Sequence, residues 1–264
     1  MGLEQRSCLP RGQAKPFQLV FLHGAWHGAW CWDQGFLQFF ADSGFEAHAL
    51  SLRHHGKSHQ PGKLRFTRIK RYVEDLAEVM DTLENPIVIG HSMGGFIVQK
   101  YLEQNKAAGG ILMAPAPYSG VLGTVARIAL KAPLAWLKAH ATLSLKPVVG
   151  SPALAHRFLF SPEMCPDKVS DYAGRLTDES YWAFLDMLAF DLPDTRKVDT
   201  PMLVLGAGRD NVFTPEEIRK TARVYGARLE FFDEMAHDMM LEDGWEKVAE
   251  AILNWIDDHL EARV

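Results

Sequence analysis

The stretch PIVIGHSMGG, residues 86–95, places a serine between two glycines directly after a short apolar strand. Three of the strand residues are β-branched, and residues 95–102 after the serine show apolar positions on one helical face. A sharp strand-to-helix turn lifts a serine hydroxyl clear of the sheet, and glycines two residues before and after it leave room for the crowded backbone. The stretch therefore predicts a nucleophile elbow at Ser92.

A serine nucleophile needs partners elsewhere in the chain, because its hydroxyl reacts only when a base takes the proton and a carboxylate orients that base. In the chain order that accompanies this elbow, the acid follows a later strand and the histidine a still later one. Asp210 follows the apolar run 202–205, and His237 follows the run 229–232. We therefore expect Ser92, Asp210 and His237 at the same edge of one sheet as nucleophile, orienting acid and base.

Other acids and histidines fit these roles less well. Asp199 precedes its strand and would lie at the opposite edge, while Asp233 stands only four residues before the proposed base. The cluster of His54, His55 and His59 raises the question of a metal site, but no H-E-x-x-H or comparable ligand spacing accompanies it. The sequence therefore predicts no metal site.

Negative charge that develops on a substrate oxygen needs two preorganised N–H donors. The residue after the nucleophile, Met93, supplies one, and the loop after the first long strand supplies the other. That loop begins with His23 and Gly24, and the glycine lets the backbone turn its amides inward. The amides of Ala25 and Met93 are therefore the expected oxyanion donors.

Strand-like runs alternate with helical patterns along most of the chain, which indicates parallel βαβ units. The expected strands span residues 17–22, 46–50, 87–89, 110–113, 202–205 and 229–232. The clearest helices span residues 67–83, with Thr67 as cap, and 245–260, and a capping box opens a third at residues 214–217. This order predicts an α/β fold with a mostly parallel central sheet flanked by helices.

One segment breaks the alternation. Residues 115–193 contain only apolar helical stretches punctuated by prolines, so we expect an inserted helical cap on a core of residues 1–114 and 194–264. The cap's large apolar residues are candidates for a substrate pocket, namely Trp136, Phe158, Phe160, Met164, Tyr181, Trp182, Phe184 and Met187. Of these, Trp182 is selected for substrate binding together with Trp26 and Met239 beside the triad.

Composition narrows the class of protein. A chain of 264 residues can bury the core of a single-domain enzyme, and its net charge of −5 without a Lys/Arg run disfavours nucleic acid as a partner. Three cysteines without C-x-x-C spacing predict neither a disulfide framework nor a zinc finger. No signal-peptide core or run of about 18 apolar residues is visible, so we expect a cytoplasmic protein without a membrane span, with its first dozen residues as a loose tail.

Taken together, these residues resemble the α/β-hydrolase superfamily over nearly the whole chain. Residues 23–32, HGAWHGAWCW, are similar to a loop of the plant methylesterase and hydroxynitrile lyase group and of related bacterial esterases. Residues 53–58 resemble a Gly-His-Gly-x-Ser turn of bacterial members, with His54 where glycine is usual. The resemblance implies a serine hydrolase that needs no cofactor, with a mainly parallel sheet of six to eight strands and a lid.

The leading functional hypothesis is a carboxylesterase that forms an acyl-enzyme on small to medium esters. The same triad would serve a carbon-carbon bond hydrolase, a thioesterase or a cofactor-free perhydrolase, and a non-catalytic ligand-binding member of the fold is a further alternative. Gly24 and Asp238 stand where the related lyases carry threonine and lysine, which disfavours cyanohydrin cleavage. Ser92 excludes the ester-forming carboxylate that epoxide hydrolases and dehalogenases need.

Overall fold

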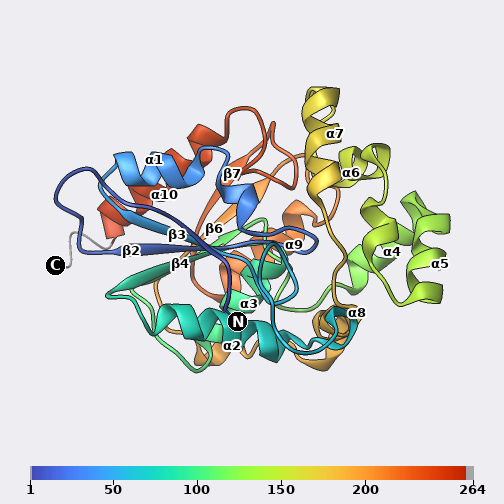
Figure 1. Cartoon of the computed structure of the whole chain (residues 1–264), viewed down its shortest axis with the longest axis horizontal. Coiled ribbons are helices and arrows are strands. Elements are labelled where there is room, and N and C mark those ends of the chain that lie inside the picture. Colours follow the sequence, from blue (N-terminus) through green and yellow to red (C-terminus); the bar gives the residue numbers. More distant parts are fainter. Residues whose placement is uncertain (1, 260–264) are drawn as a thin grey trace.

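The computed structural model describes residues 2–259, which form a seven-stranded sheet with helices on both faces (Figure 1). The strands are β1 (Gln5–Cys8), β2 (Gln18–Leu22), β3 (Glu46–Leu50), β4 (Pro86–His91), β5 (Gly109–Met113), β6 (Met202–Ala207) and β7 (Arg228–Phe232). Their spatial order is β1-β3-β2-β4-β5-β6-β7, and only the β1–β3 pair is antiparallel. The predicted α/β fold with a mostly parallel sheet is confirmed.

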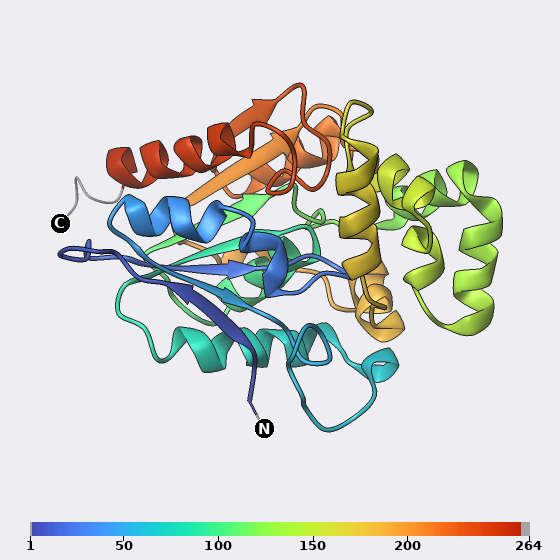
Figure 2. The ribbon, with the colours of Figure 1, turned by 45° about the horizontal axis from the view of Figure 1, so that its top comes forward.

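Ten α-helices accompany the strands in the described residues. They are α1 (Phe36–Asp42), α2 (Ile69–Met80), α3 (Met93–Leu102), α4 (Leu122–Lys131), α5 (Pro133–Thr142), α6 (Pro152–Leu159), α7 (Pro166–Arg175), α8 (Tyr181–Leu185), α9 (Pro215–Val224) and α10 (Trp245–His259). Helices α1 and α10 cover one face of the sheet, and α2 and α3 cover the other (Figures 1 and 2). The sheet is therefore the middle of three layers.

The centre of the sheet is its most buried part. Every residue of β5 and β6 is buried, because helices pack on both faces of these strands. Their sequences are accordingly near-continuous apolar runs, GGILM and MLVLGA, rather than alternating ones. At the edge, β7 has no fully buried residue and is paired on one side only. The central strands thus give the loops that follow them a rigid base.

The prediction of a loose tail at the start of the chain is wrong. Residues 5–8 form β1, which pairs with β3 in a register that sets Gln5 opposite Leu50. The preceding Glu4 also binds the molecule, since its amide donates to Ser58 Oγ at 2.8 Å and its Oε2 accepts from the Lys57 amide at 2.8 Å. A four-residue polar edge strand carries no apolar run, so the hydrophobic pattern did not indicate it.

Two of the predicted helix boundaries also need comment. Thr67 was expected to cap α2, but the helix begins at Ile69 and Arg68 occupies the cap position without a side-chain cap bond. The capping box before α9 is present, with Thr214 and Glu217 bonded reciprocally. The predicted end of the last helix at Leu260 lies outside the described residues.

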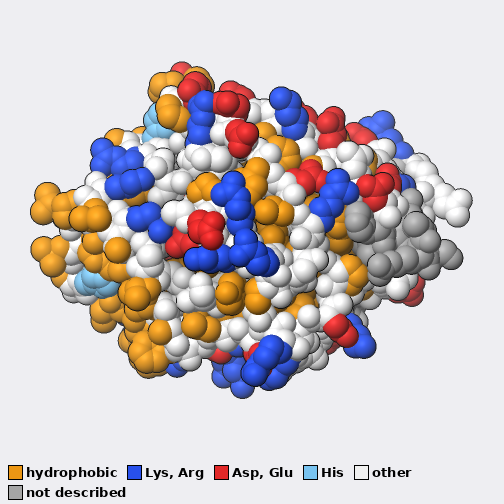
Figure 3. All heavy atoms as spheres, turned by 180° about the vertical axis from the view of Figure 1, so that it is seen from behind, with side chains coloured by type: hydrophobic (Ala, Val, Ile, Leu, Met, Phe, Trp, Pro, Cys, Tyr) orange, Lys and Arg blue, Asp and Glu red, His pale blue; other side chains and the backbone are white. Residues whose placement is uncertain are grey.

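Helices α4 to α8 lie between β5 and β6 in the chain and gather at one end of the molecule (Figures 1 and 2). Residues 115–193 contain no strand in the structure. Seen from behind, hydrophobic side chains collect at the left end of the surface, where α4 and α5 lie (Figure 3). Within residues 2–259, no helix is both long and apolar enough to span a membrane. A cytoplasmic location stays a prediction.

Candidate active site

Ser92 stands at the turn between β4 and α3 in a strained backbone conformation. Its φ of 53° and ψ of −117° lie in a region that residues with a side chain rarely adopt. The surrounding chain holds this turn in place, since the Ser92 amide donates to the Met113 carbonyl at 3.0 Å and the Phe96 amide donates to the Ser92 carbonyl at 3.2 Å. The elbow geometry expected from the sequence is therefore present.

Glycines surround the elbow because there is no space for a side chain. A Cβ atom on Gly94 would lie 2.5 Å from the Leu22 carbonyl oxygen, and one on Gly90 would lie 2.5 Å from the Gly94 carbonyl oxygen. Both contacts are with backbone atoms, which cannot rotate away. The first turn of α3 thus packs directly on the end of β2, which brings the elbow close to the loop that follows this strand.

Three side chains from three loops form one hydrogen-bonded chain at this edge. His237 Nε2 lies 2.9 Å from Ser92 Oγ, and His237 Nδ1 lies 2.8 Å from Asp210 Oδ2. Ser92 follows β4, Asp210 follows β6 and His237 follows β7, so all three come from the carboxyl ends of parallel strands. The sequence predicted this meeting of residues that are up to 145 positions apart.

The carboxylate of Asp210 is fixed by its own loop. Its Oδ1 accepts hydrogen bonds from the amides of Val212 at 2.7 Å and Phe213 at 3.0 Å, which leaves Oδ2 for His237. The Asp210 and His237 side chains are 1% and 2% exposed. Because water is excluded, the carboxylate orients the imidazole strongly. Asp210 Oδ2 accepts the Nδ1 proton of His237, so Nε2 is free to accept a proton from Ser92.

The environment also sets the basicity of His237. Burial alone would lower the pKa of this imidazole, because a charged ring is costly away from water. The negative charge of Asp210 and its hydrogen bond act in the opposite sense and outweigh burial, so the pKa of His237 is raised above 6.5. A histidine with a pKa in this range is suited to take and return a proton near neutral pH.

The loop after β2 approaches the elbow closely. A Cβ atom on Gly24 would lie 2.8 Å from His91 Nδ1 and 2.9 Å from Ser92 Cβ, so only glycine fits at this position. The next residue, Ala25, lines the same cavity as Ser92 and Met93. Neither the Ala25 nor the Met93 amide donates a hydrogen bond to any other of residues 2–259. Both amides are therefore available as oxyanion donors, the role that the sequence predicted for them.

A second buried network, which sequence reasoning missed, connects the loops of the site. His27 Nδ1 lies 2.8 Å from the Ala25 carbonyl oxygen, and His27 Nε2 lies 3.1 Å from Asp238 Oδ2. Both partners are acceptors, so the ring satisfies both when each nitrogen carries a proton. His91 Nε2 in turn donates to the His237 carbonyl at 2.9 Å. The residues beside the nucleophile and the base thus fasten the oxyanion loop, the elbow and the histidine loop together.

The charge of Asp238 belongs to this network. Burial alone would raise the pKa of its carboxyl, but the electrostatic interaction and the hydrogen bond with the neighbouring His27 lower the pKa below the ordinary value. Asp238 and His27 are both buried, with side chains 0% and 1% exposed. The signal that could have found the pair is the position of Asp238 directly after the base.

Most of the candidate metal-ligand atoms in this region already form hydrogen bonds, while His91 Nδ1 and Asp238 Oδ1 have no hydrogen-bond partner among residues 2–259. Nitrogen or oxygen atoms of His91, His237 and Asp238 lie within 4.8 Å of one another. However, His91 Nε2 bonds a carbonyl and both ring nitrogens of His237 bond triad partners. In the other histidine cluster of the sequence, His55 is buried with Nε2 3.1 Å from Glu179 Oε2, while His54 borders a separate surface pocket. The donor arrangement at the triad suits proton transfer.

Ser92 opens onto an apolar cavity between the sheet edge and helices α4, α5 and α8. The cavity encloses about 590 Å³ of space not filled by protein atoms, its opening included. Its walls include Trp26 from the oxyanion loop together with Trp136, Phe184 and Met187 from the segment after β5. An apolar cavity with a few converging polar groups is the usual form of a small-molecule site.

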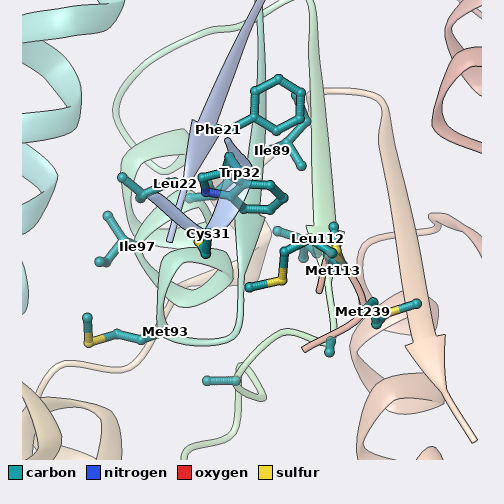
Figure 4. Close-up of a cluster of buried hydrophobic side chains, with 14 of the residues drawn as sticks. Phe21, Leu22, Cys31, Trp32, Ile89, Met93, Ile97, Leu112, Met113 and Met239 are labelled. Atoms are coloured by element: carbon teal, nitrogen blue, oxygen red, sulfur yellow. The ribbon is translucent and has the colours of Figure 1, made fainter. Parts of the chain in front are cut away.

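The structure corrects two of the predicted pocket residues. Trp26 lines the cavity as expected, but Trp182 does not, because its ring packs on the outer surface against Phe66 at 5.7 Å and is 41% exposed. Met239 is fully buried among core side chains and is not a lining residue (Figure 4). Phe184, two residues after Trp182 on the same helix, takes the lining position.

The other cap candidates divide between cavity and core. Trp136, Phe184 and Met187 line the cavity, as expected. Phe158, Phe160 and Met164 are at most 2% exposed and pack in the hydrophobic core instead. Tyr181 accepts or donates a hydrogen bond at 2.5 Å with His140 Nδ1, outside the cavity wall.

Comparison with known proteins identifies the family. A family model described as the alpha/beta hydrolase family matches residues 19–251, and the chain belongs to this family. Among curated proteins, norfluorocurarine synthase 2 from Strychnos is 38% identical over 90 residues, which are 33% of this chain and 32% of that protein. Methylesterase 3 from Arabidopsis thaliana is 35% identical over 80 residues, which are 29% of this chain and 30% of that protein. The matches thus span about a third of the length of these relatives.

Solved structures resemble the chain over almost its full length. A non-heme bromoperoxidase, BpoC, from Mycobacterium tuberculosis gives a TM-score of 0.76 at 20% identity and covers 98% of this chain and 96% of its own. A monoacylglycerol lipase from Paleococcus ferrophilus gives a TM-score of 0.74 at 23% identity, and the match covers 98% of this chain and 100% of the lipase chain. At these identities the similarity establishes the fold.

Proposed function

We propose that this protein is a serine carboxylesterase that hydrolyses small to medium carboxylic esters through an acyl-enzyme. One observation carries the proposal, namely the continuous hydrogen-bonded chain from Asp210 through His237 to Ser92 at the floor of an apolar cavity. The methylesterases among the curated relatives support an ester as the substrate class.

The geometry supports the following acylation step. His237 Nε2 takes the hydroxyl proton of Ser92 while Oγ attacks the ester carbonyl carbon, and the carbonyl π electrons move to the oxygen. The amides of Ala25 and Met93 would stabilise this oxyanion. When the tetrahedral intermediate collapses, the bond to the alkoxy oxygen breaks and His237 gives its proton to the leaving alcohol.

Deacylation repeats the sequence with water as the nucleophile. His237 removes a proton from water, the hydroxide oxygen attacks the acyl carbon, and the proton returns to Ser92 Oγ as the carboxylic acid leaves. Asp210 orients the ring throughout and stabilises the imidazolium that forms twice per cycle. All groups for both steps come from this chain, so the proposal includes no cofactor.

We also propose that residues 115–193 act as a cap over the site and set acyl specificity. Support comes from the cavity wall, where Ile128, Trp136 and Phe184 of this segment face a site whose reacting groups all come from the sheet edge. The triad and the oxyanion amides would handle the ester carbonyl that all substrates share, and the cap would contact only the variable chain.

A panel of p-nitrophenyl esters of graded chain length tests the activity. Wild-type protein should hydrolyse them, and Ser92→Ala should lower kcat by about 10⁴ to 10⁶ because it removes the only nucleophile in the mechanism. Ser170→Ala, at an exposed position of α7, is the matched control and should leave kcat unchanged. Near-normal turnover by a folded Ser92→Ala variant would refute the proposal.

A further inference from the structure

Helices α4 and α5 expose a group of leucines to solvent. Leu130 is 84% exposed, Leu134 is 82% exposed and Leu137 is 67% exposed. Leu134 and Leu137 are three residues apart on α5 and share one face, and Leu130 is the penultimate residue of α4, close to the turn into α5. We call these three residues the leucine surface. Large apolar side chains that gather on the surface of a folded protein are a feature of interaction sites.

The same two helices line the cavity with their inner face. Val125 and Ile128 of α4 and Trp136 of α5 form part of the cavity wall. The two helices are therefore apolar on the side that faces the cavity and again on the side that carries the leucine surface. A helix that is hydrophobic around its whole circumference is normally covered on all sides, yet only Ala139 is buried among the ten residues of α5.

The segment that carries the leucine surface has charged residues of one sign, although Arg127 on α4 pairs with Glu217 from α9. Residues 104–162 contain six Lys or Arg residues and no Asp or Glu, although the whole chain has a net charge of −5. Lys131, Lys138 and Arg157 are exposed, and none of them forms an ion pair with a carboxylate in the described part of the chain. Arg157 donates to the Lys131 carbonyl at 2.9 Å, which places these two cations beside Leu130.

This combination argues against a second copy of the chain as the occupant. In a two-fold symmetric dimer the same patch appears on both subunits, so the cations of one copy would face those of the other. A lipid surface with anionic headgroups accommodates both features, because acyl chains receive the leucines and headgroups attract the lysines and arginine. The acidic remainder of the chain would be repelled, which orients the molecule with α4 and α5 toward the lipid.

We propose that the leucine surface and its flanking cations dock the protein on anionic lipid surfaces, where the adjoining cavity takes up lipophilic esters. The docking itself is independent of the catalytic activity, whereas the delivery of an ester from the bound surface rests on the proposed function. In Figure 3 the hydrophobic side chains of this end are flanked by Lys and Arg, with Asp and Glu placed farther along the molecule.

Vesicle flotation tests the docking with the full chain. Vesicles of phosphatidylcholine with roughly 30% phosphatidylglycerol should bind the protein about tenfold more strongly than pure phosphatidylcholine vesicles, and salt at roughly 0.5 M should abolish the difference. The triple variant Leu130→Ser, Leu134→Ser, Leu137→Ser should lose about tenfold in binding, and Lys131→Glu with Lys138→Glu should lose the preference for anionic vesicles.

Matched controls change the same residue types elsewhere. Leu9→Ser with Val224→Ser removes exposed apolar side chains, and Lys63→Glu with Lys247→Glu reverses exposed charges, in both cases away from α4 and α5. These controls should bind vesicles like the wild type. All variants should hydrolyse p-nitrophenyl acetate at the wild-type rate, because none of the changed residues lines the cavity that contains Ser92.

The two readouts keep the proposals distinguishable. Loss of vesicle binding with unchanged hydrolysis of the soluble ester supports the docking surface. Binding that is equal for neutral and anionic vesicles, unchanged in the leucine variants, or absent would overturn it, whatever the esterase result. If gel filtration instead shows an oligomer that the leucine substitutions dissociate, the surface is a protein interface and the lipid proposal is wrong. Vesicle binding without ester hydrolysis would refute only the proposed function.

Discussion

Helices α3 and α5 have ten residues each but differ strongly in how many of those residues are buried. In α3, which begins at the elbow, every residue except Lys100 is buried. In α5, which lines the cavity from the other side, only Ala139 is buried. The helix that follows Ser92 is thus fixed by contacts on all sides, whereas α5 at the opposite cavity wall is supported on one face. We therefore expect substitutions that displace Ser92 to abolish activity, and substitutions in the proposed cap to be tolerated.

The glycines of the two regions show the same contrast. Gly94 lies at the first turn of α3 against the Leu22 carbonyl, whereas an added Cβ on Gly174 of α7 would meet nothing within 4 Å. Backbone contact leaves no alternative to glycine at the elbow. In α7 the glycine serves no visible packing purpose.

The largest effect on catalysis should come from the rigid region. Asp210→Asn should lower kcat by roughly 10³ to 10⁴, because the amide no longer fixes the tautomer and orientation of His237. The imidazole must be neutral to accept the Ser92 proton, so activity is lost as pH falls through its pKa. In the wild type that acid limb should lie above pH 6.5, because Asp210 raises the pKa of His237. In Asp210→Asn, burial dominates and the limb should move to lower pH in a kcat/KM profile.

Asp233→Asn is the control for this prediction. Asp233 stands four residues before His237, and its side chain is not among the hydrogen-bond partners of that histidine. Its kcat and its pH profile should match those of the wild type. The assignment of the acid would be wrong if Asp233→Asn abolished activity while Asp210→Asn left it intact.

Stability should respond oppositely in the two regions. Gly94→Ala should lower the free energy of unfolding by about 2 to 3 kcal/mol, because the new Cβ would lie 2.5 Å from the Leu22 carbonyl oxygen. Gly174→Ala should raise it by roughly 0.5 to 1 kcal/mol, since alanine is favoured over glycine inside a helix and space is free. Urea denaturation measures both. Equal effects at the two positions would contradict the contrast between the regions.

The smallest effect should be a change of specificity in the cap. Phe184→Ala enlarges the cavity and should shift the preferred acyl chain length, by contacts worth about 1 to 3 kcal/mol per methylene, while kcat on acetate esters stays within about tenfold. Trp182→Ala, on the same helix but outside the cavity, should leave the chain-length profile unchanged. A shift in Trp182→Ala without one in Phe184→Ala would show that the pocket lies elsewhere.

Local patterns were sufficient to predict the central strands and the meeting of Ser92, Asp210 and His237 at one edge of the sheet. Strands β5 and β6 are continuous apolar runs, and Ser92, Asp210 and His237 each follow such a run. The rule that carboxyl ends of parallel strands share an edge then brings them together. A residue that directly follows a parallel strand lies at the carboxyl edge of the sheet, so its place can be predicted from the order of residues in the sequence.

Contacts that depend on packing were not predictable in this way. The pairing of His27 with Asp238 joins residues 211 positions apart and depends on how two loops fold over the sheet edge. Trp182 and Phe184 are two residues apart on one helix, and their opposite exposures depend on the rotation of that helix about its axis. Strand β1 forms because it pairs with β3, and its own residues show no strand pattern that would have predicted it.

Covalent labelling of Ser92 tests the central claim most directly. The claim is that His237, oriented by Asp210, activates the Ser92 hydroxyl as a nucleophile. A fluorophosphonate probe followed by peptide mass spectrometry should find the adduct on Ser92 alone, and His237→Ala should slow its formation by about 10³-fold or more. Labelling at another residue, or an equal rate in folded His237→Ala protein, would contradict the account.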